Sequence, residues 1–412
     1  MKRILSVISY IFISVALFFS GVMLDVSPSD LVSQVVQDQK DVDDQDQADD
    51  LLQLDDSKDS IDASGDSDDA DVQDEPENQI NTRYYYSLMD DSERENYDKI
   101  QEAIAGEESS VVLGAMNQQE LERIFKCVYN DYPEYFWCEH SYSYRNTDEG
   151  MELIFDYNCT GSEREKREAE IEKQAGAILA GLPADGEDYD KVKYVFETLV
   201  DMTKYELDAP DNQNIYSVFG NWTTVCAGYA KATKYLLDRA GVECFYVTGL
   251  ADGERHAWNI VKCNGQYYYV DTTWGDPLYQ ETQGEEMQKK ETAYEYLCCS
   301  GDLLFRTHTP DTDFTLPECA DNSMEYYRMA GRYLESADQN AILEIMKKDI
   351  DNNEKQTEIQ FSGSDALNQA VAQIDSTLQQ MREYTKSQKG KSLGDLWYTY
   401  RNNTSVLIVY WE

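Results

Sequence analysis

The dipeptide Asn264-Gly265 is the feature that most constrains how this chain folds. It joins two alternating apolar segments, residues 256–263 and 266–272, and a two-residue Asn-Gly loop is the typical turn of a β-hairpin. Such a turn sets the register, so that residue 258 lies opposite 271 and residue 256 opposite 273. The side chains of His256 and Asp271 then share one face as diagonal neighbours, within reach of each other.

A cysteine stands at the start of a predicted helix upstream of this hairpin. Residues 225–230 read Val-Cys-Ala-Gly-Tyr-Ala and open a helix that we expect to end near Arg239, with Thr223 and Thr224 as candidate N-caps. Cys226 falls in the first turn, where unpaired backbone N–H groups and the helix dipole stabilise a thiolate.

Cysteine, histidine and aspartate in this placement form the nucleophile, the base and the orienting carboxylate of a thiol enzyme. Taken singly, each has a structural interpretation: a small buried thiol, a strand histidine and a turn cap. Their combined placement favours a catalytic role over these structural ones. We therefore predict Cys226, His256 and Asp271 as the catalytic residues.

Three segments carry a resemblance to a known family. They are VCAGYA at residues 225–230, HAWN at 256–259 and YYYVDTTWGDP at 267–277. In this order the chain resembles the transglutaminase-like superfamily, over about residues 186–280, and its flanks look like those of exported bacterial members. The resemblance implies a papain-like core, in which the nucleophile helix packs on an antiparallel sheet, and the same roles for the three catalytic residues. We expect no cofactor and no metal.

Other residues near these motifs have less certain roles. Trp258, Trp274 and Tyr229 are predicted to line the substrate cleft, with aromatic core packing as the alternative. The oxyanion donor beyond the backbone N–H of Cys226 stays open, and the candidates are Asn221, Trp222 and Tyr216. The remaining histidines, His140 and His308, have no partner in the pattern and are predicted to be surface or structural residues.

The segments on either side of the core repeat one pattern of elements. On the N-terminal side we expect helices at residues 92–105 and 117–132, a strand at 110–113 and a hairpin at 140–145 and 151–157; on the C-terminal side, helices at 339–351 and 365–384, a strand at 357–361 and a hairpin at 396–400 and 406–411. Tyr-Ser-Tyr-Arg-Asn at 142–146 resembles Tyr-Thr-Tyr-Arg-Asn at 398–402. The predicted fold class is thus α+β, a core flanked by two small αβαββ modules. They descend from a duplication or are alike by chance, and a duplication requires the same strand order in both.

The N-terminus has the pattern of an export signal. Lys2 and Arg3 precede an uncharged run over residues 4–24, which as a helix would span a bilayer's hydrocarbon core of about 30 Å. We expect an uncleaved membrane anchor in preference to a cleaved signal, with the body of the protein outside the cytoplasm, anchored or secreted.

Residues 25–80 hold 20 acidic and 2 basic side chains and are predicted to be a disordered linker. The predicted domains are residues 1–24, the anchor; 25–80, the linker; 81–185, an N-terminal α+β module; 186–320, the catalytic domain; and 321–412, a C-terminal α+β module.

Charge and cysteine content limit the partners. A net charge of −45 argues against nucleic acid and against a basic patch on lipid, so the membrane is contacted only through the N-terminal helix. Nine cysteines suit an oxidising compartment. If Cys226 stays reduced, eight remain to pair, and Cys244 with Cys263 is one possible disulfide.

The residues and the resemblance lead to one expected function and one alternative. We expect an exported thiol enzyme that acts on amide or peptide bonds through a Cys226 acyl-enzyme, with a protein or peptide substrate such as a cell-wall peptide. Attack by water would make it a cysteine protease or amidase, and attack by an amine would make it a transamidase; the sequence leaves both open. The alternative is a catalytically silent binding protein of the cell surface that keeps the fold.

Overall fold

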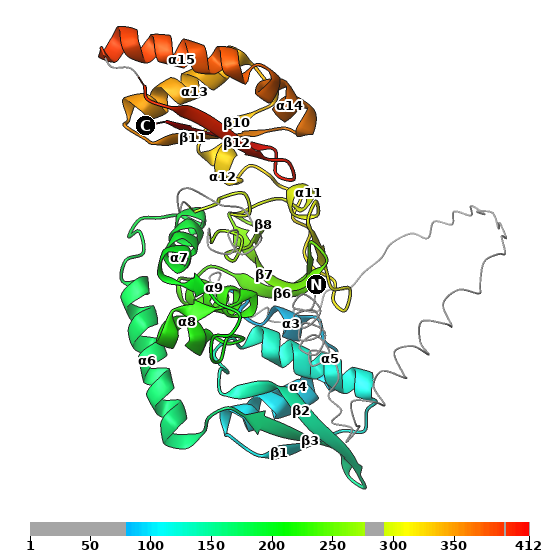
Figure 1. Cartoon of the computed structure of the whole chain (residues 1–412). Coiled ribbons are helices and arrows are strands. Elements are labelled where there is room, and N and C mark those ends of the chain that lie inside the picture. Colours follow the sequence, from blue (N-terminus) through cyan, green and yellow to red (C-terminus); the bar gives the residue numbers. More distant parts are fainter. Residues whose placement is uncertain (1–79, 277–291, 391–392, 412) are drawn as a thin grey trace, which may run out of the picture. The chain divides into compact units, whose positions relative to one another are not determined.

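A computed structural model describes residues 80–276, 292–390 and 393–411 (Figure 1). The predicted anchor at residues 1–24 and almost all of the predicted linker at 25–80 lie outside these residues. Within the described part of the chain, no helix is both long and apolar enough to cross a membrane. The described residues form an α+β structure.

A four-stranded antiparallel sheet and one buried helix form the centre. The strands are β6 (Cys244–Ala251), β7 (Glu254–Cys263), β8 (Gln266–Val270) and β9 (His308–Pro310), in the order β8-β7-β6-β9. Helix α9 (Cys226–Arg239) packs on β6 and β7, and α7 (Asp188–Met202) and α8 (Ile215–Asn221) lie beside it (Figure 1). Every α9 residue from 227 to 237 is buried. A helix buried on all sides belongs to the core, so its first residue is held firmly.

The hairpin between β7 and β8 has the predicted turn and register. Asn264 and Gly265 have φ angles of 49° and 80°, both in the left-handed region that this turn requires. Cys263 pairs with Gln266 and Asn259 with Val270. Strand β8 ends two residues earlier than predicted, because the backbone N–H of Asp271 leaves the ladder and donates to the Tyr296 carbonyl at 3.0 Å. The predicted pairs of residue 258 with 271 and of residue 256 with 273 are therefore not part of the ladder.

The N-terminal module has a three-stranded sheet and shares its core with the central helices. Its elements are α3 (Tyr84–Ser87), α4 (Asp91–Ala105), β1 (Ser110–Leu113), α5 (Gln118–Asp131), β2 (Cys138–Thr147) and β3 (Gly150–Tyr157). Capping boxes at Asp90 and Asn117 begin the two longer helices. Helix α6 (Gly161–Leu179), which we did not predict, follows. One hydrophobic cluster joins this module to α7, α8 and α9.

The C-terminal module has a hydrophobic core of its own. Its elements are α12 (Tyr326–Met329), β10 (Tyr333–Leu334), α13 (Gln339–Asp351), β11 (Gln356–Phe361), α14 (Ser364–Ala372), α15 (Ile374–Lys389), β12 (Leu396–Arg401) and β13 (Val406–Trp411). The single helix predicted over residues 365–384 is wrong. The helix is interrupted at Gln373, whose side chain donates to the Ala337 carbonyl at 2.7 Å.

The two modules share a strand order. The order β1-β3-β2 corresponds to β11-β13-β12, and all these pairs are antiparallel. The hairpin turns differ, because Thr147 pairs with Gly150 whereas Arg401 pairs with Val406. The common order meets the requirement of a duplication, which stays a hypothesis. The domain boundaries also stay predictions.

Candidate active site

Cys226 begins α9 without a side-chain cap. Val225 is the N-cap residue, in an extended conformation, and its side chain accepts no hydrogen bond. The prediction of Thr223 or Thr224 as the cap is wrong, because both residues form the short strand β5 (Thr223–Thr224), which pairs with β4 (Lys204–Tyr205). The Thr224 hydroxyl instead donates to the Asn212 carbonyl at 3.0 Å. The first backbone N–H groups of α9 therefore have no side-chain cap and are available to donate to a negatively charged oxygen beside the Cys226 sulfur.

Cys226 is the one cysteine of the nine that is not buried, and all nine are free thiols. It packs against Ala230, Tyr246 and Ala257. The suggested disulfide between Cys244 and Cys263 is wrong. Strand pairing places Cys244 opposite Val261, and the Cys263 thiol forms a hydrogen bond with Cys298. Exposure therefore separates Cys226 from the other eight thiols.

His256 links the cysteine to the aspartate. Its Nε2 lies 2.8 Å from Oδ2 of Asp271, and its ring also hydrogen-bonds Cys226, which leaves Nδ1 to face the thiol. Burial alone would lower the pKa of His256, but the charge of Asp271 and the interaction with Cys226 raise it to about 10. Burial alone would raise the pKa of the Asp271 carboxyl, yet His256 and His308 hold it well below its usual range. The three predicted residues are together, and at neutral pH the imidazole is charged.

His308 is the residue that sequence reasoning missed. It is buried, so a surface position is excluded, and its Nε2 lies 3.0 Å from the same Oδ2 of Asp271. It reaches the site because β9 pairs with β6, where His308 lies opposite Ala251. No local pattern signals this pairing. The nitrogen and oxygen atoms of His256, Asp271 and His308 lie within 4.8 Å of one another, a spacing that a metal ion could also use, but the two hydrogen bonds account for it.

The predicted cleft residues have different positions. Tyr229 and Trp258 have no exposed surface, which favours the alternative of aromatic core packing for both. The Tyr229 hydroxyl donates to Oδ2 of Asp276 at 2.7 Å. Trp274 is partly exposed, and its backbone N–H donates to Oδ1 of Asp271 at 3.1 Å. Of the three, Trp274 alone has surface with which to contact a substrate.

The candidates for the oxyanion donor lie on or next to α8. Tyr216 is turned toward α6, where its hydroxyl lies 3.4 Å from Glu170 Oε2. Trp222 follows the helix in the left-handed conformation, with φ 56°. Asn221 is exposed. The backbone N–H of Cys226 remains the donor that the helix geometry itself supplies.

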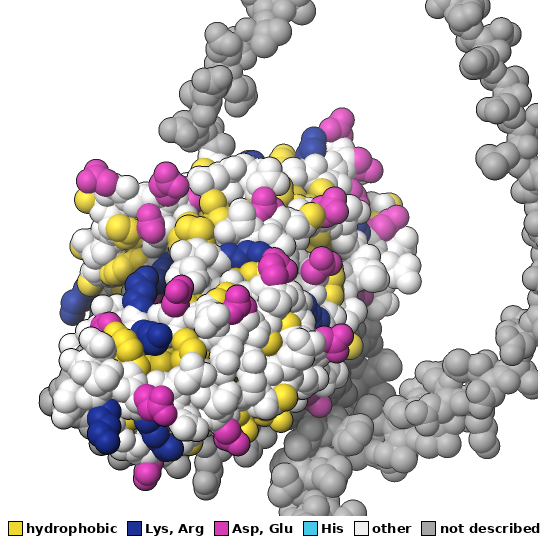
Figure 2. All heavy atoms as spheres, turned by 90° about the horizontal axis from the view of Figure 1, so that it is seen from above, with side chains coloured by type: hydrophobic (Ala, Val, Ile, Leu, Met, Phe, Trp, Pro, Cys, Tyr) yellow, Lys and Arg dark blue, Asp and Glu magenta, His cyan; other side chains and the backbone are white. Residues whose placement is uncertain are grey.

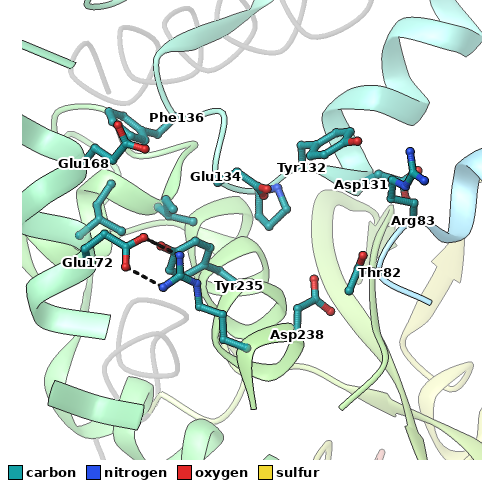
Figure 3. A pocket seen from close by; sticks show the side chains of 14 residues that line it. Thr82, Arg83, Asp131, Tyr132, Glu134, Phe136, Glu168, Glu172, Tyr235 and Asp238 are labelled. Carbon is teal, nitrogen blue, oxygen red and sulfur yellow. Dashed lines mark hydrogen bonds and ion pairs between the residues drawn. The ribbon is translucent and has the colours of Figure 1, made fainter. Parts of the chain in front are cut away.

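A separate cavity of about 520 Å³ lies at the other end of α9 (Figure 3). Tyr235, Asp238 and Arg239 contribute to its wall, and Arg239 forms an ion pair with Glu172 of α6. An α-helix rises about 1.5 Å per residue, so about 14 Å of α9 separates Cys226 from Tyr235, the lining residue of α9 that comes first in the sequence. It is not part of the triad's surroundings.

The surface is mixed in charge on the face that Figure 2 shows. Acidic and basic side chains are interspersed there, with hydrophobic side chains scattered between them. A phosphate backbone would need a continuous basic area. This face offers none.

Comparison with known proteins agrees with the site. Residues 178–272 match the model of the transglutaminase-like superfamily, and that stretch contains all three triad residues. Kyphoscoliosis peptidase of Mus musculus is 26% identical over 112 residues, which cover 23% of this chain and 17% of the relative. Residues 178–272, which hold the triad, therefore form a transglutaminase-like core.

Two solved structures resemble parts of the chain. One is a TGase, with 13% identity and a TM-score of 0.25, covering 45% of this chain and 52% of the other. The second is a proposed cysteine protease from Cytophaga hutchinsonii, with 13% identity and a TM-score of 0.24, covering 34% of this chain and 63% of the other.

Proposed function

We propose that this protein is an exported thiol enzyme that cleaves amide bonds of peptides or proteins through an acyl-enzyme on Cys226. The observation that carries the proposal is the hydrogen-bonded series from Cys226 through His256 to Asp271, which begins at a partly exposed thiol. An imidazolium beside a cysteine is the arrangement that keeps a catalytic sulfur ionised.

The reaction has two steps. The Cys226 sulfur attacks the carbonyl carbon, and the negative oxygen meets the uncapped N–H groups at the start of α9. His256 then gives its proton to the departing amine, and the C–N bond breaks to leave a thioester. Next, His256 takes a proton from water, the hydroxide oxygen bonds to the acyl carbon, and the C–S bond breaks. The carboxylic acid leaves and the thiolate returns.

Water is the proposed acceptor, which makes the enzyme a peptidase or amidase. If a primary amine replaced water in the second step, the product would be a new amide and the enzyme a transamidase. Cell-wall peptides or extracellular proteins are the proposed substrates, because residues 1–24 have the composition of a signal or membrane anchor.

A silent binding protein is less well supported. That function would suit a Cys226 that is buried or disulfide-bonded, or a His256 turned away from it. Cys226 is instead a free, partly exposed thiol, and His256 hydrogen-bonds both neighbours.

A thiol-directed peptidyl vinyl sulfone tests the proposal. Wild type and the Cys226→Ala variant are incubated with the probe, and labelling is measured by mass spectrometry. The matched control is Cys159→Ala, which removes a buried free thiol instead. We expect Cys226→Ala to abolish labelling and Cys159→Ala to leave it unchanged. Equal labelling of wild type and Cys226→Ala would contradict the proposal.

A second assay separates the two acceptors. A glutamine-containing peptide is offered to wild type with and without an added primary amine. Hydrolysis releases the same acid in both reactions, whereas transamidation converts the peptide to the amine adduct.

A further inference from the structure

Two of the three histidines in this chain converge on one oxygen atom. His256 Nε2 lies 2.8 Å and His308 Nε2 lies 3.0 Å from Oδ2 of Asp271. Asp271 has no exposed surface and His308 is 1% exposed, so solvent does not compete for these hydrogen bonds. The reaction proposed above uses only one of the two imidazoles.

The donors and acceptors around Asp271 can be assigned. An ionised carboxylate only accepts hydrogen bonds, so the Nε2 atoms of both histidines must carry a proton. The other oxygen, Oδ1, accepts from the backbone N–H of Trp274 at 3.1 Å. Three donors thus replace water around a buried negative charge, which would otherwise be costly to bury.

His308 is itself held from the side opposite Asp271. Its Nδ1 lies 2.8 Å from the Thr307 hydroxyl, which lies 2.9 Å from the hydroxyl of Tyr296. The Thr307 hydroxyl can donate to Nδ1 or, at 3.3 Å, to the Leu304 carbonyl. Donation to the nearer Nδ1, with Tyr296 donating to Thr307, places the His308 proton on Nε2, where Asp271 needs it. A connected series of hydrogen bonds therefore runs from Tyr296 to the catalytic base.

We propose that His308 is a positioning residue of this enzyme, which holds the Asp271 carboxylate in line with His256 through its Nε2–H. This inference rests on the proposed function. Without His308, one lone pair of Oδ2 would be buried without a donor, and the carboxylate could rotate or accept a proton. Either change weakens the hold on His256, and a misplacement of about 1 Å can cost about 10²-fold in rate.

Nitrogen NMR of ¹⁵N-histidine-labelled wild type tests the hydrogen bonding without using activity. With three histidines, the His308→Gln and His140→Gln variants assign every signal. We expect a proton on Nε2 of His308 that exchanges slowly, and none on Nδ1. An unprotonated Nε2 on His308 would overturn the proposal, because that nitrogen could not donate to Asp271.

Enzyme kinetics separate positioning from simple core packing. Glutamine can place its side-chain nitrogen where Nε2 of histidine lies, whereas leucine fills space without a donor. We expect His308→Leu to lower kcat about 10²-fold and to move the alkaline limb of the pH profile to lower pH. His308→Gln should restore most of the rate and the limb.

Two results would overturn the inference. One is a folded His308→Leu with the wild-type pH profile, and the other is a folded His308→Gln as impaired as His308→Leu. If His308→Leu does not fold, Thr307→Val takes its place, and an unchanged profile there counts against the proposal. Failure of the proposed function is seen separately, as probe labelling that survives Cys226→Ala.

Discussion

The Nε2 atom of His256 lies 2.8 Å from Oδ2 of Asp271, although the two residues stand on opposite sides of a hairpin turn. The turn at Asn264 and Gly265 sets the strand register and brings the two side chains within reach. The contact therefore depends on the hairpin and on the Tyr296 carbonyl, which accepts the backbone N–H of Asp271. Cys226 is the first residue of helix α9, which is buried on all sides, and it lies beside His256.

The pH dependence of activity should show the charge on His256. Its pKa is raised to about 10, so the imidazolium is present at neutral pH and activity should fall as the pH rises through about 10. A raised pKa also means that the charged imidazole contributes to stability fully below its ordinary pKa of 6.5 and loses that contribution through about 10. Initial rates measured from neutral to alkaline pH give the midpoint of this fall, the alkaline limb of the pH profile.

Asp271→Asn tests the cause of that limb. Without the carboxylate charge, the pKa of His256 should fall, the limb should move to lower pH and the rate should drop about 10²- to 10⁴-fold. An unchanged limb in a folded Asp271→Asn variant would mean that Asp271 does not set the charge of His256.

Tyr229 should matter for stability rather than for substrate binding. Its buried hydroxyl donates to Asp276 at 2.7 Å, and Tyr229→Phe leaves a buried carboxylate short of a donor. We expect a loss of about 1.5–3 kcal/mol in the free energy of unfolding, measured in urea. Tyr144→Phe removes an exposed hydroxyl bonded to Gln118 and is the control, with a change within about 0.5 kcal/mol. A raised KM with an unchanged free energy of unfolding would instead indicate a substrate contact.

The glycine two residues after Cys226 should be intolerant of a side chain. A Cβ at Gly228 would overlap the Thr224 hydroxyl, so Gly228→Ala must shift the start of α9. We expect a loss of about 1–3 kcal/mol in stability together with reduced activity. Gly176→Ala in α6, where nothing lies within 4 Å, should stabilise by about 0.5–1 kcal/mol. Equal effects of the two substitutions on the urea midpoint would refute this explanation.

Local signals were sufficient for much of the fold. The Asn-Gly turn and the apolar periods located the central hairpin, α9 and most elements of both flanking modules. The triad followed, since its members lie at a helix start and on one hairpin. These features depend on residues close together in the sequence.

Other features depend on contacts between residues far apart in the sequence, which no local pattern predicts. His308 reaches Asp271 only because β9 pairs with the edge of β6. Helix α6 was missed because only Ile171, Ala175 and Ile178 of its side chains are buried, which leaves little apolar period. The end of β8 is set by the carbonyl of Tyr296, far along the chain.

The most direct test of the central claim is to trap the acyl-enzyme. Wild type and Cys226→Ala react briefly with an activated acyl ester, are quenched in acid and are digested for mass spectrometry. The account predicts one acyl group in wild type, on the peptide that contains Cys226, and none there in the variant. An acyl group on another residue, with Cys226 unmodified, would contradict it.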